Sequence, residues 1–272
     1  MNVDCLVNIF ERVGMESLLL DVPFVCKSWY KATLNPNCWK RLLFPKLDHY
    51  DYSEDSRLED AYRFHSKSAI TSFVKFVVKR SKRQGTVLAL PACCTEEALL
   101  YAAEECPELR CLVLRSELLH DHGPMILEII SKWKNLEFIR LVGSLHLQEI
   151  LGRVSTHCRN FNGLGATAYI GEEATLAIVT LVPKIKYLDL RRANIERKNL
   201  MKILKECREL EYLDARDCIG FDEDDEEIIK LGSHIRKFMR EGSMLYDYDD
   251  FKCSYRDDGF HDDTLAEANL DR

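Results

Sequence analysis

A leucine pattern that recurs every 24 to 27 residues limits what this chain can fold into more than any other feature. Segments of the form L-x-x-L-x-L begin at residues 109, 136, 161, 185 and 210, and a weaker copy begins at Gly85. Their pattern positions are Leu109/Leu112/Leu114, Leu136/Ile139/Leu141, Phe161/Leu164/Ala166, Ile185/Leu188/Leu190 and Leu210/Leu213/Ala215. A period of this length indicates one short supersecondary unit that is repeated along the chain.

Helical patterns fill the spaces between these segments, at residues 96–106, 125–133, 147–158, 175–182 and 199–207. An apolar residue or a cysteine also stands three residues before each of the last five starts: Cys106, Trp133, Cys158, Val182 and Cys207. One strand and one helix cannot bury their own apolar face, so the copies must stack. The sequence therefore predicts an α/β leucine-rich-repeat solenoid over residues 85–220, an arc of about six strand–helix repeats.

The strand residues that alternate with the pattern leucines are expected on the concave face of the sheet, because side chains alternate along a strand. Several of them are tyrosine or arginine, which commonly anchor protein interfaces. A face that is merely solvated is the alternative. We predict that a target protein binds through Arg115, Phe138, Arg140, Tyr187, Asp189, Arg191, Tyr212, Asp214 and Arg216.

The residues before the repeats divide into a helical module, 1–44, and a segment, 45–84, that combines a linker with an N-terminal capping helix. In the module, Leu6, Ile9 and Phe10 have the spacing of one helical face. Ser68 is expected to cap the second helix, which covers residues 69–82. The basic cluster at residues 79–83 is interpreted as a solvated helix end rather than an import signal.

The C-terminal residues are acidic. Residues 217–272 carry a net charge of −10, which leaves +3 on residues 1–216. Residues 221–240 begin with six consecutive acids and are predicted to form a C-terminal capping helix that includes Ile235 and Phe238. Residues 241–272 have no clear period and are predicted to be a disordered tail, with folding upon a partner as the alternative.

Composition places the protein inside the cell, in the nucleus and/or the cytoplasm. The 272 residues are 46% hydrophobic, and the chain shows neither a signal peptide nor a long apolar run. The 11 cysteines include no CxxC pair, which favours buried free thiols over a disulfide scaffold. With a net charge of −7, we predict neither a nucleic-acid nor a membrane partner.

No catalytic or metal-binding pattern is present. The chain lacks the GxxxxGK[ST], GxGxxG, HExxH and GxSxG motifs. The segment 120–122, His-Asp-His, is expected in a loop before a helix and has no third ligand at a useful spacing, and Cys93-Cys94 is interpreted as a pair of packing residues. Six repeats enclose no pocket, so we predict a non-enzymatic protein without metal or cofactor.

The helical module resembles an F-box. The matching segments are Asp4-Cys5-Leu6-Val7-Asn8-Ile9-Phe10, then Val22-Pro23-Phe24-Val25-Cys26-Lys27-Ser28-Trp29, then Asn35-Pro36-Asn37-Cys38-Trp39. Together with the repeats, nearly the whole chain resembles the plant F-box/LRR-repeat proteins. The resemblance implies a substrate-recognition subunit of an SCF ubiquitin ligase, which docks a Skp1-type adaptor joined to a cullin and presents a target protein for ubiquitination.

The same resemblance implies a docking face. Its residues would be Leu6, Ile9, Phe10, Leu18, Leu19, Pro23, Val25, Cys26, Trp29 and Trp39. Members of the family normally begin with an apolar Leu-Pro lead-in, whereas this chain begins Met1-Asn2-Val3. A shortened first segment is expected to weaken adaptor binding, so the alternative function is a leucine-rich-repeat scaffold with a truncated F-box and no ligase role.

Overall fold

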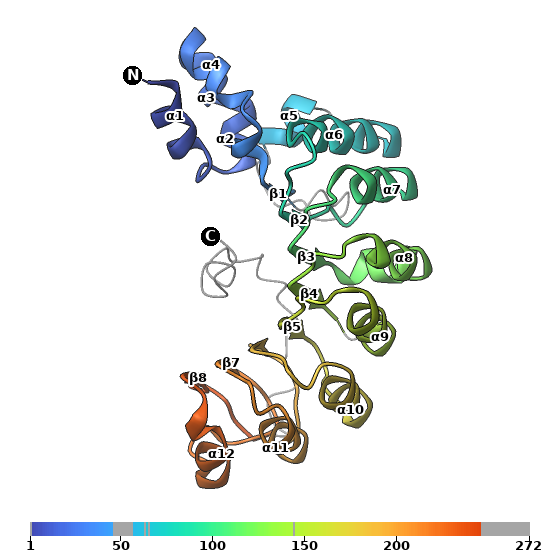
Figure 1. The fold of residues 1–272 in the computed structure, drawn as a ribbon, viewed down its shortest axis with the longest axis vertical. Helices are drawn as coiled ribbons and strands as arrows, with labels where there is room; N and C mark the ends of the chain where they lie inside the picture. Colours follow the sequence, from blue (N-terminus) through green and yellow to red (C-terminus); the bar gives the residue numbers. More distant parts are fainter. Residues whose placement is uncertain (1, 46–56, 63, 65, 144, 246–272) are drawn as a thin grey trace. The chain divides into compact units, whose positions relative to one another are not determined.

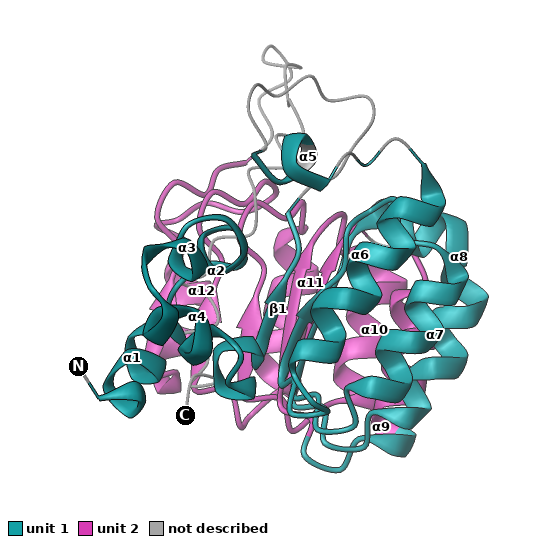
Figure 2. Ribbon diagram, turned by 90° about the horizontal axis from the view of Figure 1, so that it is seen from above, with its two compact units in different colours: residues 1–137, 156–160 teal, residues 138–155, 161–272 magenta. Residues whose placement is uncertain are grey.

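A computed structural model shows an α/β fold in which short helices precede alternating strands and helices (Figure 1). It describes residues 2–45, 57–62, 64, 66–143 and 145–245. The chain divides into two compact units, residues 1–137 with 156–160 and residues 138–155 with 161–272 (Figure 2). The predicted fold class, a leucine-rich-repeat solenoid preceded by a small helical module, is confirmed.

The first unit begins with the helical module and continues into three parallel strands and their helices. The module elements are α1 (Val3–Phe10), α2 (Met15–Leu20), α3 (Val22–Val25), α4 (Lys27–Thr33) and the 3₁₀ helix η1 (Pro36–Trp39). The remaining elements are β1 (Arg41–Leu43), α5 (Arg57–Tyr62), α6 (Lys67–Arg80), β2 (Val87–Ala89), α7 (Glu96–Glu105), β3 (Cys111–Leu114), α8 (Ser116–Ile129) and η2 (Ile130–Lys132).

Local sequence explains where the module helices begin. The Asn2 side chain accepts a hydrogen bond from the Asp4 N–H at 3.2 Å and caps α1, and Asn35 caps η1 in the same way. Asparagine is favoured at this position because its oxygen satisfies a backbone N–H that the helix leaves unpaired. Trp39 closes the module core: it is 1% exposed, and its indole N–H donates to the Thr33 carbonyl at 2.6 Å.

The module runs directly into the sheet. Strand β1 pairs in parallel with β2, with Leu42 opposite Leu88. Only Lys40 separates η1 from β1, and its carbonyl accepts hydrogen bonds from the Thr86 and Val87 N–H groups. Residues 41–43 were predicted to end the module and are instead the first strand, so the predicted linker that begins at residue 45 follows the sheet's first strand rather than preceding it.

The helices of the first unit differ slightly from prediction. Helix α6 begins two residues earlier than expected, and Ser66 rather than Ser68 is its cap, accepting from the Ala69 N–H at 3.2 Å. Helices α6, α7 and α8 lie side by side (Figure 1). Pro124 stands inside α8, where His122 has non-helical torsion angles, because a proline cannot continue the hydrogen-bond ladder.

The second unit contains five parallel strands and their helices. In chain order they are β4 (Phe138–Val142), α9 (Leu147–His157), β5 (Gly163–Thr167), α10 (Glu172–Leu181), β6 (Tyr187–Asp189), α11 (Arg197–Glu206), β7 (Tyr212–Asp214), α12 (Glu226–Leu231), the 3₁₀ helix η3 (Gly232–His234) and β8 (Lys237–Met239). The last two residues of α9 belong to the first unit. Helix α10 packs against α11, and α11 against α12.

The strand register confirms the repeat pattern. The middle pattern residue of each copy is paired with the middle pattern residue of the next copy. In the second unit the paired residues are Ile139 with Leu164, Leu164 with Leu188, and Leu188 with Leu213. All four side chains are fully buried. Every strand that the pattern predicts, from the weak copy at Gly85 to the copy at Leu210, is present as β2 to β7.

The residue that stands three positions before each copy of the pattern lies at the end of the preceding helix. Cys106, Trp133, Val182 and Cys207 are C-cap residues, and each carbonyl accepts a hydrogen bond from the N–H three residues later. All four side chains are buried, as is that of Cys158. Burial raises the pKa of the Cys106 thiol to about 12. These thiols are therefore packing groups, as predicted, because the reactive form of cysteine is the thiolate.

The C-terminal prediction is wrong in part. Helix α12 ends at Leu231, and residues 237–239 form a strand that pairs with β7, so this segment is a further repeat and not a capping helix. The Phe238 ring lies against Gly232, where a Cβ atom would be 2.5 Å from Cδ1 of the ring. Ser243 is also ordered, and its hydroxyl donates to the Ala215 carbonyl at 2.6 Å. The rest of the predicted tail, residues 246–272, lies outside the described residues.

Candidate functional site

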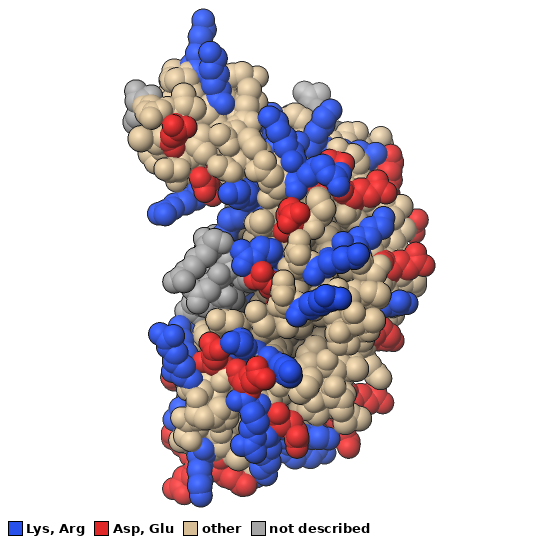
Figure 3. All heavy atoms as spheres, viewed as in Figure 1, with Lys and Arg blue, Asp and Glu red and all other residues tan. Residues whose placement is uncertain are grey.

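The first candidate surface consists of apolar side chains on the helical module. Phe24 is 78% exposed and Val25 is 59% exposed, at the end of α3. We define the module face as these two residues with four further exposed apolar residues on α1, α4 and the α4 C-cap: Val3, Ile9, Tyr30 and Leu34. Figure 3 shows that the visible side of the module, at the top, is largely uncharged. Exposed apolar groups gathered on so small a module indicate an interaction site.

Buried residues hold this surface in place. The Phe10 ring meets the Trp29 ring edge-on, with centroids 5.2 Å apart, and so joins α1 to α4. Behind them Leu6 and Leu18 are almost completely buried. At the base of α2, Arg57 of α5 pairs with Asp21 at 2.5 Å. This last pair is exposed, so it orients the helices more than it stabilises them.

The second candidate surface lies on the strands of the second unit. Asp214 is completely buried, and its carboxylate accepts from Nε of Arg191 at 3.0 Å and from Nε and Nη2 of Arg216 at 2.9 and 2.7 Å. On the neighbouring strand, Asp189 pairs with Nη1 of Arg140 at 2.6 Å. Three guanidinium groups thus enclose two buried carboxylates.

Electrostatics keeps Asp214 ionised. Burial works to raise its pKa, but the hydrogen bonds from Arg216 and the charges of Arg191 and Arg216 outweigh burial, so its pKa lies below the usual value of 3.8. A buried carboxylate is tolerated only when it is paired and hydrogen-bonded in this way. The aspartates therefore serve to fix the arginine side chains.

Glycines make the Arg140–Asp189 pair possible. Arg140 stands on β4 and Asp189 on β6, so the arginine must cross the intervening strand β5. It crosses above Gly165, where a Cβ atom would lie 3.1 Å from its Cγ atom. At Gly163 a Cβ atom would lie 2.3 Å from the Phe138 ring. Larger residues at these two positions would displace both side chains.

Two tyrosines continue this surface toward the amino ends of the strands. The Tyr187 and Tyr212 rings lie 6.3 Å apart, and the Lys237 ammonium lies 5.4 Å from the centre of the Tyr212 ring. Such a cation over an aromatic face is attracted by the ring electrons. We call the set of Arg140, Tyr187, Asp189, Arg191, Tyr212, Asp214 and Arg216 the tyrosine–arginine ladder.

Comparison with known proteins shows which proteins the chain resembles. No protein-family model matches the chain. Among curated proteins, F-box protein FBW2 of Arabidopsis thaliana is 24% identical over 94% of this chain and 80% of its own length. F-box/LRR-repeat protein At3g48880 of the same plant is 27% identical over 78% of this chain and 69% of its own length. The resemblance to plant F-box/LRR-repeat proteins is confirmed.

Two further comparisons involve one curated protein and one solved structure. F-box protein SKIP1 of Arabidopsis thaliana is 24% identical over 79% of this chain and 77% of its own length. Among solved structures, the yeast Rad7 and Elc1 complex contains a chain that superposes with a TM-score of 0.45 at 17% identity, covering 68% of this chain and 52% of that chain. We refer below to the helical module as the F-box module, a name that records this resemblance.

The structure corrects half of the docking residues predicted for the F-box module. Ile9, Val25 and Cys26 are exposed, and Pro23 and Trp29 are half-buried. The other five form the core of the module, since short helices of so small a unit need their largest side chains inside: Leu6, Phe10, Leu18, Leu19 and Trp39. The exposed Phe24 and Tyr30 were missed, although Phe24 lies within the quoted motif.

The concave-face prediction also needs correction. Its members do lie on strands or within two residues after them, but five side chains are buried: Arg115, Phe138, Asp189, Tyr212 and Asp214. The aspartates lie beneath arginines, and Phe138 lies over a glycine. The alternation of side chains along a strand predicts neither of these two arrangements. The half-buried members, which present part of their surface, are Arg140, Tyr187, Arg191 and Arg216.

The sites that were considered for chemistry have structural roles. His122 lies inside α8, not in a loop as predicted, and its Nε2 atom is 3.0 Å from the Cys94 carbonyl oxygen. Burial raises the pKa of the Cys94 thiol to about 12. Within the described residues, no group of three or more His, Cys, Asp or Glu side chains is placed to hold a metal ion. Likewise, no described helix is both long and apolar enough to cross a membrane.

Proposed function

We propose that this chain is the substrate-recognition subunit of an SCF ubiquitin ligase. The F-box module docks a Skp1-type adaptor joined to a cullin, and the tyrosine–arginine ladder contacts a target protein. The observation that carries the proposal is the module face, with Phe24 and Val25 exposed on the helical module of a chain that is similar to F-box proteins. An intracellular location, in the nucleus and/or the cytoplasm, accompanies this role.

Burial of the module face explains how docking would be driven. Transfer of a large apolar side chain from water into an interface is favourable by about 1.5–3 kcal/mol. Six such side chains are exposed on this small module, and exposed apolar groups of this kind indicate an interaction site. A partner with a complementary apolar groove would therefore bind here with an affinity set mainly by Phe24 and Val25, the two most exposed.

The role of such a subunit is positioning, and it needs no catalytic group of its own. Joining a target and a ligase on one scaffold raises the effective concentration of the target beside the thioester that carries ubiquitin. The half-buried arginines and Tyr187 of the ladder suit target binding, because their side chains are already held in place before binding.

The adaptor half of the proposal predicts the effect of Phe24→Ser combined with Val25→Ser. This variant is expected to bind a purified Skp1-type adaptor at least tenfold more weakly in calorimetric titration, because two central apolar contacts are lost. Its circular dichroism and thermal unfolding are expected to match the wild type, since both residues are exposed.

Leu176→Ser is the matched control, because Leu176 is an exposed leucine on α10, outside the module. It is expected to leave adaptor binding unchanged. A wild-type chain that does not bind the adaptor would overturn the ligase role and favour the leucine-rich-repeat scaffold. Equal adaptor affinities of the wild type and the double variant would show that docking uses another surface.

The target half predicts a selective loss in affinity purification with quantitative mass spectrometry. Tyr187→Ala is expected to lose at least one recovered protein several-fold while it retains the adaptor and the cullin, because the tyrosine lies on the ladder and not on the module. Tyr169→Ala provides a control, since Tyr169 is exposed and outside the ladder. Identical recovery from both variants would argue against the ladder as the target surface.

A further inference from the structure

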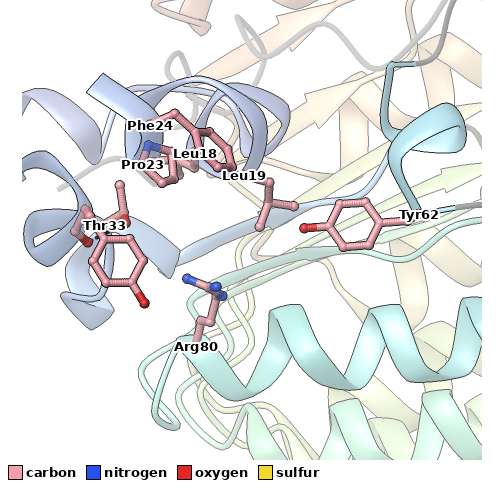
Figure 4. Close-up of a pocket in the computed structure, with 8 residues that line it drawn as sticks. Leu18, Leu19, Pro23, Phe24, Thr33, Tyr62 and Arg80 are labelled. Atoms are coloured by element: carbon pink, nitrogen blue, oxygen red, sulfur yellow. Dashed lines mark hydrogen bonds between the residues drawn. The ribbon is translucent and has the colours of Figure 1, made fainter. Parts of the chain in front are cut away.

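A pocket of about 390 Å³ lies within the first unit, between the F-box module and helices α5 and α6 (Figure 4). Apolar side chains form most of its wall, and the polar groups come from two tyrosines, one threonine and one arginine. The lining residues are Leu18, Leu19, Pro23, Phe24, Tyr30, Thr33, Tyr62 and Arg80. Its volume lies in the range of sites that bind small molecules, about 300–1,000 Å³.

Arg80 supplies the only positive charge among the residues that line this pocket. It is the last residue of α6, and Figure 4 shows its guanidinium pointing from the helix toward the module. The guanidinium lies 4.5 Å from the centre of the Phe76 ring and 5.0 Å from that of Trp39. These rings hold the group in one place, so it is positioned before any ligand arrives.

This arginine lacks a carboxylate partner within the described part of the chain. Its Nε atom is buried and makes no hydrogen bond. Arg140, Arg191 and Arg216 contrast with it, since each of these three pairs with an aspartate. Because a buried N–H that stays unsatisfied is destabilising, such a group calls for an acceptor.

The neighbouring polar groups do not supply that acceptor. The Thr33 hydroxyl donates to the Tyr30 carbonyl at 2.8 Å. Figure 4 shows the Tyr62 hydroxyl directed into the same space as Arg80, with no hydrogen bond between them. Burial lowers the pKa of Arg80, while the nearby Tyr62 and Tyr30 act in the opposite direction. The guanidinium therefore faces a largely apolar space, and no carboxylate among the described residues compensates its charge.

We propose that this pocket binds a small organic anion, namely an apolar body that carries one carboxylate. The carboxylate would accept from Arg80, and the apolar body would lie against Leu18, Leu19 and Pro23. The volume favours a free small molecule over a single acidic side chain from a docked protein, which would leave most of the space unfilled.

The experiment uses the full chain and a matched pair of probes, 4-tert-butylbenzoate and its neutral amide, in calorimetric titration and ligand-observed NMR. The acid is expected to bind the wild type at least tenfold more tightly than the amide. Arg80→Gln is expected to abolish that preference, whereas Lys79→Gln should keep it, since Lys79 is an exposed neighbour on the same helix that does not line the pocket.

A second variant protects the test against misfolding of Arg80→Gln. Phe24→Ala removes one wall of the pocket at an exposed position, and it is expected to weaken binding of the acid several-fold while the fold is retained. Equal binding of acid and amide by the wild type, or an acid preference that survives Arg80→Gln, would overturn the proposal. So would inorganic phosphate binding as tightly as the acid, because the apolar wall would then play no part.

Discussion

Asp214→Ala is expected to lower the free energy of unfolding by about 3–5 kcal/mol, which is the usual cost of removing one partner from a buried ion-pair network. The carboxylate is fully buried and accepts from both Arg191 and Arg216. Its removal leaves two half-buried guanidinium groups without their anion. Urea-induced unfolding at pH 7, followed by circular dichroism, measures the change.

Asp224→Ala is the matched control for this substitution. Asp224 is an exposed aspartate in the acidic segment before α12, and removing it is expected to change stability by no more than about 0.5 kcal/mol. If both variants unfolded at the same urea concentration, the ladder would not be the stabilising network that its geometry indicates.

The same carboxylate predicts a pH dependence with a defined sign. Despite the opposing effect of burial, its folded pKa lies below 3.8, so its contribution to stability is fully present above the unfolded value of about 3.9. That contribution is lost as the pH falls through the folded pKa. The stability difference between the wild type and Asp214→Ala is therefore expected to be constant above about pH 5 and to shrink below about pH 4. A difference that grew on acidification would contradict this assignment.

Trp39→Ala is expected to cost about 3–5 kcal/mol, as large-to-small substitutions of buried aromatic residues do. The indole is 1% exposed, donates to the Thr33 carbonyl at 2.6 Å and lies beneath the Arg80 guanidinium. Removing it opens a cavity where the F-box module passes into β1. Thermal and urea unfolding of the full chain measure the loss, and adaptor binding is expected to fall with the folded fraction.

Trp29→Ala provides the comparison within the same module. Trp29 is half-buried and contacts Phe10, so its removal leaves a smaller cavity and is expected to cost less stability than removal of Trp39. It is also expected to weaken adaptor binding directly, since part of the ring is accessible. A greater loss of stability from Trp29 than from Trp39 would contradict the assignment of Trp39 as the core residue.

The repeats could be predicted because their information is local and periodic. Apolar residues at the pattern positions place one side of each strand in the core, and residues such as Leu164 and Leu188 then align from strand to strand. The helix ends were also predictable to within a turn, since residues such as Cys106 recur in register. Neither conclusion needed knowledge of distant contacts.

The outermost strands were not predictable in the same way. Strand β1 has only three residues and follows a helical module, and β8 lies in a segment whose apolar spacing also fits a helix. Pairing with the neighbouring strand decides both structures, as with Phe238 opposite Leu213. Local propensity is a weak guide where tertiary pairing supplies most of the stability.

The functional surfaces were predicted only in outline. The F-box module is apolar on several sides, so periodicity alone does not separate the buried Leu6 from the exposed Phe24. In the ladder, the pairing of Arg140 with Asp189 crosses a whole strand and depends on Gly165. The pocket at Arg80 joins residues from the module, α5 and α6, and no sequence pattern connects them.

The single residue between η1 and β1 has a mechanical consequence. A flexible linker sets only a range of distances between the bodies it joins, whereas a stiff connector also transmits orientation. Lys40 is such a connector, since its carbonyl is held by the N–H groups of Thr86 and Val87 at 2.8 and 3.1 Å. A rotation of the F-box module would therefore be transmitted to strands β1 to β3, which would turn together with it.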